Sequence, residues 1–358
     1  MAASKAASTP ATGALLSLVL LHAGCTMPDG APGDEYTEAI PRASQVAINV
    51  PGVAAAADDG VAPKPLSEIG EDIDLGERLR ESSGQLMGEL TALTVIGRRA
   101  ELYQITHDVS RAINGFVLGI VAIVREVSTW PATSRSADGA SRTWGPWTEA
   151  LSPVTHRLTI IRSGPGTMTF SLLGKPKRAG DAAYVEIMGG TFVGVGSGHG
   201  HGQFFIDASA AHGLDPEGNH GVGRADIQWD NSVVPRTVVL DLRDFADRAG
   251  APTATAQYRY REATDGAGTF EFRVEGDLDR NNDPFGQKTR KEHLAVVSRW
   301  LASGAGRADM VATNGDLPWA ALNAQECWDE DFRRAYYTDD RGLAPTEGDR
   351  ARCVFPAP

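Results

Sequence analysis

Clusters of basic residues are absent from this sequence of 358 residues, in which Asp and Glu number 46 against 34 Lys and Arg. The formal net charge of −12 would repel a phosphate backbone, so nucleic acid is excluded as an expected partner. Aromatic residues are few, at 7%, while hydrophobic residues reach 42% and charged residues 22%. This composition is typical of a soluble globular protein and excludes a coiled coil or a wholly disordered chain.

Catalytic signatures are also lacking. The glycine-rich run at residues 196–202 contains no GxGxxG, because His201 stands where the last glycine belongs, and no GxSxG surrounds Ser197. A dinucleotide-binding fold and an α/β-hydrolase therefore both lose support. We assign no catalytic residue from the sequence.

Cysteine is scarce, and the odd count of three means that the cysteines cannot all pair within one chain. Residues 14–23 form an uncharged, mostly apolar stretch behind a single basic residue, Lys5. This stretch is typical of a signal peptide and is too short to span a bilayer. The small residues Ala23 and Gly24 stand directly before Cys25.

The Ala23-Gly24-Cys25 sequence resembles the lipobox of bacterial lipoproteins, although His22 stands where that family prefers leucine. The resemblance implies removal of a signal peptide at residues 1–24, acylation of Cys25 with fatty acids such as palmitate, and a membrane partner held through the amino-terminal lipid. Because Thr26 follows and not Asp, it also implies a cell-envelope location at the outer membrane, facing the periplasm or the cell surface. An ordinary secretory signal that leaves Cys25 as a free thiol is the alternative.

The next part of the chain divides by composition. Prolines recur through residues 25–65 and block both helix and strand, so we expect a flexible tether there. Residues 66–127 form a helical segment in which apolar residues recur at spacings of three and four. The nearly apolar run at residues 112–124 covers about 20 Å as a helix, short of the roughly 30 Å hydrocarbon core, so we expect a buried helix. The stripe consists of Leu102, Ile105, Val109, Ile113, Phe116, Ile120 and Val124.

Residues 128–315 show a period of two with frequent turn residues, which predicts about ten antiparallel strands. Tyr258 and Tyr260 alternate with polar residues, as do Phe270 and Phe272, and the turn at residues 265–268 joins these two strands as a hairpin. The sequence therefore predicts a mainly β protein with an amino-terminal helical segment (α+β), built as a large antiparallel meander, curved sheet or β-barrel packed around a helix.

Residues 316–358 form a carboxyl-terminal segment that contains the two remaining cysteines. In an exported chain we expect Cys327 and Cys353 to form a disulfide bond, which would stabilise the fold by roughly 3.5 kcal/mol in the chain-entropy model. Two unpaired buried thiols are the alternative. We interpret the charges from Glu326 to Arg334 as a solvated face with local ion pairs.

Several short motifs from Trp144 onward resemble those of a group of uncharacterised exported, β-rich lipoproteins of myxobacteria and their relatives. The resemblance implies a lipid-anchored β protein, and it transfers neither an activity nor a catalytic residue. The motifs are Trp144-Gly145-Pro146-Trp147, Gly200-x-Gly202-x-Phe204 ahead of Asp207, Ser298-Arg299-Trp300, Gly304-Ala305-Gly306-Arg307, Glu326-Cys327-Trp328-Asp329, Tyr336-Tyr337, Glu347-Gly348-Asp349 and Cys353-Val354-Phe355.

His199 and His201 are two apart, so on a strand both imidazoles would face the same side and hold a divalent metal, with Asp207 or Asp215 as a further ligand. A glycine-rich turn with exposed histidines is the simpler interpretation, and no other cofactor is indicated. The oxygen-rich stretch at residues 277–283 departs from the EF-hand calcium pattern, with Asn282 where glycine is needed, so we interpret it as a solvated loop.

Trp144 and Trp147 flank a Gly-Pro turn. Exposed, the two rings would stack on a sugar or an apolar ligand; buried, they would close one end of the core. The sequence as a whole favours a non-enzymatic binding or scaffold protein for an apolar small molecule or an envelope protein. A tethered hydrolase or metalloenzyme that uses the His199/His201 loop is the alternative.

Overall fold

The structure is a computed structural model that describes residues 35–52, 97–195, 198–246, 248–277 and 290–356. It contains one antiparallel sheet of 15 strands, and the order of the strands in the sheet is their order in the chain. The strands are β1 (Ser134–Arg135), β2 (Ser141–Trp147), β3 (Val154–Gly164), β4 (Thr167–Pro176), β5 (Val185–Val193), β6 (His201–Asp207), β7 (Val222–Asp230), β8 (Arg236–Ala246), β9 (Ala254–Glu262), β10 (Gly268–Gly276), β11 (Glu292–Trp300), β12 (Gly306–Asn314), β13 (Ala321–Trp328), β14 (Arg334–Asp339) and β15 (Glu347–Gly348).

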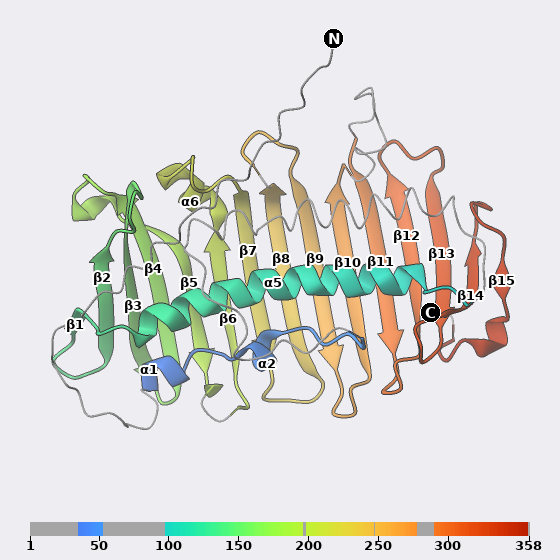
Figure 1. Cartoon of the computed structure of the whole chain (residues 1–358), viewed down its shortest axis with the longest axis horizontal. Helices are drawn as coiled ribbons and strands as arrows, with labels where there is room; N and C mark the ends of the chain where they lie inside the picture. The colour runs from blue at the N-terminus through green and yellow to red at the C-terminus, as the bar shows by residue number, and fades with distance from the viewer. Residues whose placement is uncertain (1–34, 53–96, 196–197, 247, 278–289, 357–358) are drawn as a thin grey trace, which may run out of the picture. The chain divides into compact units, whose positions relative to one another are not determined.

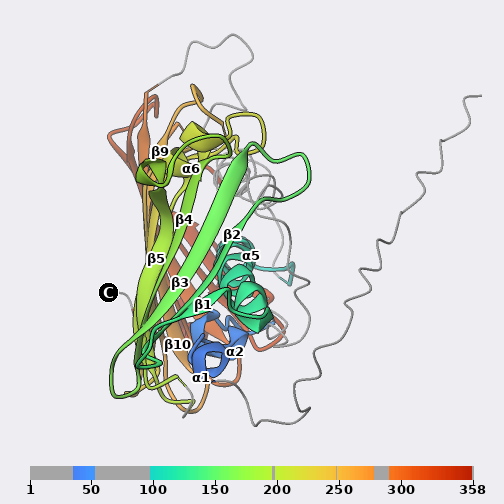
Figure 2. The same ribbon diagram turned by 90° about the vertical axis from the view of Figure 1, so that its left-hand side faces the viewer.

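One long helix, α5 (Glu101–Thr129), crosses the strands on one face of this sheet (Figures 1 and 2). We call this side the helix face and the opposite side the open face. The other helices of the described residues are short: α1 (Glu35–Glu38), α2 (Ala43–Val46), α6 (Ala208–Leu214), and the 3-10 turns η1 (Asp181–Ala183) and η4 (Arg350–Arg352).

Alternation of side chains, interrupted at β-bulges, sorts the residues between the two faces. The hairpin of β9 and β10 pairs Tyr260 with Phe270 and Tyr258 with Phe272, as the sequence predicts, and all four rings are buried on the helix face. The seven apolar residues of the predicted helical stripe are likewise all buried in α5. The core is therefore the layer between α5 and the sheet.

Helix α5 is long and apolar enough to cross a membrane, with a mean hydropathy of 1.5, and 61% of that window is buried inside the protein. Glu326 of β13 holds its amino-terminal end, because the Leu102 N–H donates to Oε2 at 2.5 Å. Thr106 contacts Ser298 of β11 through its hydroxyl at 2.6 Å. These contacts make α5 a core helix of the sheet.

Residues 35–52, which the composition places in a flexible tether, are built into the core. Tyr36, Val46 and Ile48 are no more than 1% exposed. The Asn114 side chain of α5 accepts from the Ile48 N–H at 2.7 Å and donates to the Ile48 carbonyl at 2.8 Å. The prediction therefore misplaces this strap (residues 35–52), because apolar residues between the prolines supply a buried face. Residues 25–34 and 53–65 of the predicted tether, and the predicted helical residues 66–96, lie outside the described residues.

The carboxyl-terminal segment continues the same sheet as β13, β14 and β15. Cys327 and Cys353 are paired with an S–S distance of 2.08 Å. Glu326 and Arg334 are 0% and 2% exposed, so the interpretation of these charges as a solvated face is wrong at both positions. Glu326 faces the helix side because it is in phase with Leu322 and Ala324 along β13, and Arg334 pairs with Trp328 at a β-bulge between β13 and β14. Their mutual contact compensates the burial.

The mainly β fold class with a packed helix is confirmed. The barrel alternative differs from the structure, because β1 and β15 do not pair and the sheet is open. Both edge strands are only two residues long, and Pro146 removes a backbone donor at the neighbouring edge of β2. Such edges resist pairing with a further strand.

Candidate functional site

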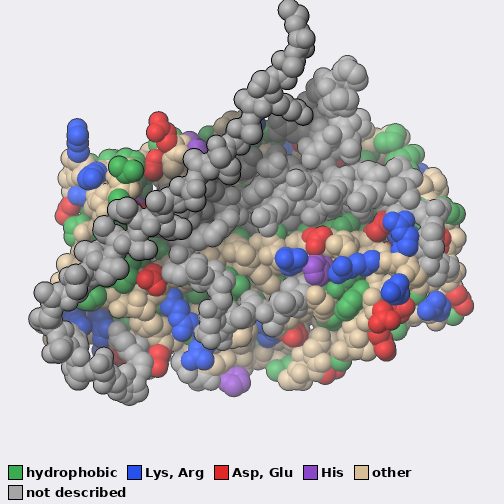
Figure 3. Space-filling model, viewed as in Figure 1, with side chains coloured by type: hydrophobic (Ala, Val, Ile, Leu, Met, Phe, Trp, Pro, Cys, Tyr) green, Lys and Arg blue, Asp and Glu red, His purple; other side chains and the backbone are tan. Residues whose placement is uncertain are grey.

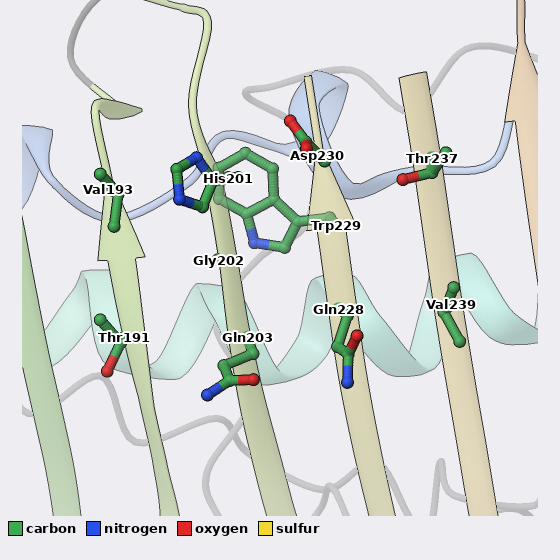
Figure 4. A pocket seen from close by; sticks show the side chains of 10 residues that line it. All are labelled: Thr191, Val193, His201, Gly202, Gln203, Gln228, Trp229, Asp230, Thr237 and Val239. Carbon is green, nitrogen blue, oxygen red and sulfur yellow. The ribbon is translucent and has the colours of Figure 1, made fainter. Parts of the chain in front are cut away.

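A groove of about 470 Å³ crosses β5 to β8 on the open face of the sheet (Figure 4). Register explains which residues meet there. Thr191, Gln203, Gln228 and Val239 form one row of cross-strand partners. A second row consists of Val193, His201, Asp230 and Thr237.

Several of the lining side chains are hydrogen-bonding groups that have no side-chain bond among the described residues, whereas the Thr191 hydroxyl contacts that of Thr169 at 3.4 Å. Within the described chain, the amides of Gln203 and Gln228 have no side-chain hydrogen bond. Asp230 accepts from the Ser232 N–H at 2.8 Å and from its hydroxyl at 2.5 Å, both through Oδ1, which leaves Oδ2 without a hydrogen bond among the described residues. Each glutamine amide offers a donor and an acceptor together, the combination that pairs with neighbouring hydroxyl groups of a ligand.

Gly202 and Trp229 form the floor beneath this lining. Trp229 is 2% exposed on the helix face. A Cβ on residue 202 would lie 2.6 Å from the Thr191 carbonyl and 3.1 Å from the Trp229 Nε1, so only glycine fits here. This packing holds β5, β6 and β7 in the register that aligns the groove.

The predicted metal ligands are not brought together. His199 and His201 are both exposed, His199 in the loop before β6 and His201 at its first residue. Asp207 caps α6 by accepting from the Ala210 N–H at 2.8 Å, and Asp215 accepts from the Gly218 N–H at 3.0 Å. Among the described residues, no group of three or more His, Cys, Asp or Glu side chains could hold a metal ion.

The groove does not have the arrangement of a nucleophilic triad. His201 pairs with Asp230, and Asp230 pairs with Thr237 across the next strand. In a triad the imidazole lies between the nucleophile and the carboxylate, whereas here the carboxylate lies in the middle. The tethered hydrolase that uses His199 and His201 therefore gains no support from these positions.

The tryptophans lie at the β2 end of the sheet, away from the groove. Trp144 is 1% exposed and donates from Nε1 to the Trp130 carbonyl at 2.8 Å. Trp147 is half-buried between the rings of Trp130 and His156, with centroid distances of 5.7 and 5.6 Å. Burial lowers the pKa of His156 to about 4, against the opposing charge of Asp215. Trp144 thus closes the core, the second of the two roles considered for it.

The apolar ligand that the sequence favours would lie on the helix face of the sheet. Helix α5 and the strap cover it, and the strap is bonded to the sheet: the Tyr260 hydroxyl donates to the Asn49 carbonyl at 3.1 Å, and Arg236 donates to the Ala47 carbonyl at 2.9 Å. A second groove of about 330 Å³ lies on the open face across β9 to β12, and it includes Arg273, Glu275 and His293.

Other predicted positions fall outside the described residues, namely Cys25 and residues 278–283. Sequence reasoning missed Thr191, Gln203, Gln228, Asp230 and Thr237, because none belongs to a motif. The period of two predicts that these side chains point outward. Which of them lie opposite one another depends on the register between neighbouring strands, and the alternation along a single strand does not define that register.

The fold and groove define a class: a single open β-sheet with a core helix and a polar binding groove on its uncovered face. No family model, no curated protein and no solved structure matches the chain. The function is therefore argued from the groove itself.

Proposed function

We propose that this chain is a lipid-anchored, non-enzymatic binding protein of the bacterial cell envelope, and that its groove across β5 to β8 takes a hydroxyl-rich ligand such as a glycan chain. The observation that carries the proposal is the pair of unused amides on Gln203 and Gln228, flanked by Thr191, Thr237 and Asp230. An open groove of this kind suits a ligand that lies across the strands. Its volume is within the range of small-molecule sites.

The ligand class follows from the charges and polarity of the lining. Asp230 is the single carboxylate, and His201 is the single group that can become cationic, so neither strong cations nor strong anions are favoured. Val193 and Val239 add small apolar surfaces, which suit the C–H faces of a sugar ring. We therefore propose a hydroxyl-rich ligand in place of the apolar small molecule, because α5 and the strap cover the helix face of the sheet.

Binding to a glycan array, followed by calorimetry on the detergent-solubilised protein, tests the groove. We expect Gln203→Ala and Gln228→Ala each to weaken binding at least tenfold. The matched control is Gln325→Ala, because Gln325 lies on the same cross-strand row at β13, beyond the groove. Equal losses in all three variants, or no binding to any glycan, would count against the proposal.

The anchor has its own test. The Ala23-Gly24-Cys25 sequence and the signal-like stretch before it support acylation, removal of residues 1–24 and location at the outer membrane. Loss of Lys5 with the signal takes the formal charge from −12 to −13. Mass spectrometry of the purified protein should find a diacylglyceryl adduct on Cys25 as the first residue. A chain that begins elsewhere with an unmodified Cys25 would remove the anchor and leave the groove untouched.

A further inference from the structure

Several loops at the two ends of the strands differ in charge. On one edge, at the bottom of Figure 1, four of the loops join β3 to β4, β7 to β8, β9 to β10 and β11 to β12 (residues 165–166, 231–235, 263–267 and 301–305). Asp265 is the single formal charge in these four loops. Three loops of the opposite edge, at residues 148–153, 177–184 and 215–221, carry Glu149, Lys177, Arg178, Asp181, Asp215 and Glu217.

We call the four nearly uncharged loops the valine edge, because adjacent valines form its most exposed apolar point. Val233 is 55% and Val234 is 64% exposed, and Pro235 beside them is also exposed. Leu301, in the loop before β12, is 38% exposed on the same edge. The same edge is charged at its β14 end, where the loop that joins β13 to β14 (residues 329–333) carries Asp329, Glu330, Asp331 and Arg333. Figure 3 shows Lys or Arg and Asp or Glu side chains gathered at that end of the molecule.

The described chain also begins at this edge. Arg162, near the end of β3, holds Glu35 in an ion pair of 3.1 Å, and the Tyr36 hydroxyl donates to the Gly139 carbonyl at 2.6 Å. Ten residues separate Glu35 from Cys25. Even fully extended, ten residues reach at most about 35 Å, so a lipid on Cys25 confines the edge where Glu35 lies to the neighbourhood of the bilayer.

We propose that the valine edge rests on the lipid surface, with Val233 and Val234 inserted at the headgroup level. This inference rests on the proposed lipid anchor and adds which part of the fold meets the membrane. Two small apolar side chains bind a bilayer weakly by themselves, but a tethered protein needs only a weak contact, because the anchor keeps the local concentration high. Since the four loops that include Val233 and Val234 carry a single formal charge, the contact that these loops make does not depend on anionic lipids or on salt.

Hydrogen exchange on the acylated protein tests the contact. We expect the backbone amides of residues 232–234 to exchange at least threefold more slowly in phosphatidylcholine vesicles than in detergent micelles. Residues 177–180 on the opposite edge should exchange equally in both. Adding anionic lipid or raising the salt concentration should leave the protection unchanged. Protection that requires anionic lipid, or equal exchange at residues 232–234 in vesicles and micelles, would overturn the inference.

Substitution separates the edge from the anchor. Val233→Ser with Val234→Ser should abolish the protection, while the acylated protein stays with the vesicles. Val185→Ser is the matched control, because Val185 is 42% exposed at the start of β5 on the other edge. The alternative to a lipid contact is that a second copy of the chain covers the valine edge. Protection that rises with protein concentration in micelles would show that copy and would overturn the lipid contact.

Discussion

At the scale of single residues, a buried ion cluster fastens α5 to the carboxyl-terminal strands. Arg334 donates from Nε to Glu326 at 2.6 Å and from Nη1 to Glu347 at 3.3 Å, and it lies 3.5 Å from Glu101 of α5. Burial raises the pKa of the Glu326 carboxyl, and the Arg334 guanidinium opposes that rise. A buried charge without its partner is costly, so this cluster acts as a unit.

Glu326→Ala should therefore lower the free energy of unfolding by about 3–5 kcal/mol, because it leaves the Arg334 charge buried without its closest partner. Denaturation by urea measures the change. Arg162→Ala is the control, because the exposed pair with Glu35 contributes about 0–1 kcal/mol. Replacing Glu326 and Arg334 together by leucine should recover part of the loss. A cost of Glu326→Ala below that of Arg162→Ala would contradict this account.

His156 makes the stability depend on pH. Burial lowers its pKa from 6.5 to about 4, and its Nδ1 has no hydrogen-bond partner among the described residues. Between these two values the unfolded chain binds the proton more readily, so stability falls as the pH falls from about 6.5 toward 4. The total loss of stability across this pH range is about 3 kcal/mol. His156→Gln should flatten the pH dependence of urea denaturation in this window, whereas His293→Gln, on a half-exposed histidine, should not. Equal slopes in the wild type and His156→Gln would exclude this role.

At the scale of elements, the strap shows how composition misleads. Its prolines predict a tether, yet backbone groups of residues 44–51 form hydrogen bonds with side chains of α5 and of the sheet. Tyr103 donates from its hydroxyl to the Pro51 carbonyl at 2.6 Å, and Asn231 donates to the Gln45 carbonyl at 2.9 Å. Such a segment shows no hydrophobic period in its sequence, because side chains distant in the sequence form the hydrogen bonds of its backbone groups.

Asn114→Ala tests how far the strap depends on α5. The change leaves the Ile48 N–H and carbonyl buried without partners, which costs about 1–3 kcal/mol for each group. We expect faster hydrogen exchange at residues 47–50 and a lower midpoint of urea denaturation. Gln104→Ala, which removes one contact to Asp108 on the more exposed side of the same helix, is the control. Unchanged exchange at residues 47–50 would show that apolar packing alone holds the strap.

At the scale of the whole fold, the sequence predicts what depends on local periodicity. The period of two predicts the antiparallel meander and the hairpin of β9 and β10, and the stripe predicts α5. The count of about ten strands in residues 128–315 falls short of the 12 strands, β1 to β12, that the structure has there. Strands β13 and β14 were missed because the inward-facing charges Glu326 and Arg334 interrupt the apolar alternation. The groove was missed for a related reason: it consists of ordinary outward residues that register aligns.

The valine edge also predicts how the sheet stands on a membrane. With this edge downward the strands are upright, and the longest strands, of 11 residues, give a layer about 40 Å thick. Fifteen strands measured across the sheet span roughly 65 Å, so a sheet standing on the β1 or β15 end would give a much thicker layer. Neutron reflectometry of the acylated protein on a supported phosphatidylcholine bilayer distinguishes the two. We expect a layer of about 40 Å in direct contact with the headgroups, and a broader, less ordered layer for Val233→Ser with Val234→Ser. A thick layer, or a water gap beneath the protein, would contradict the upright arrangement.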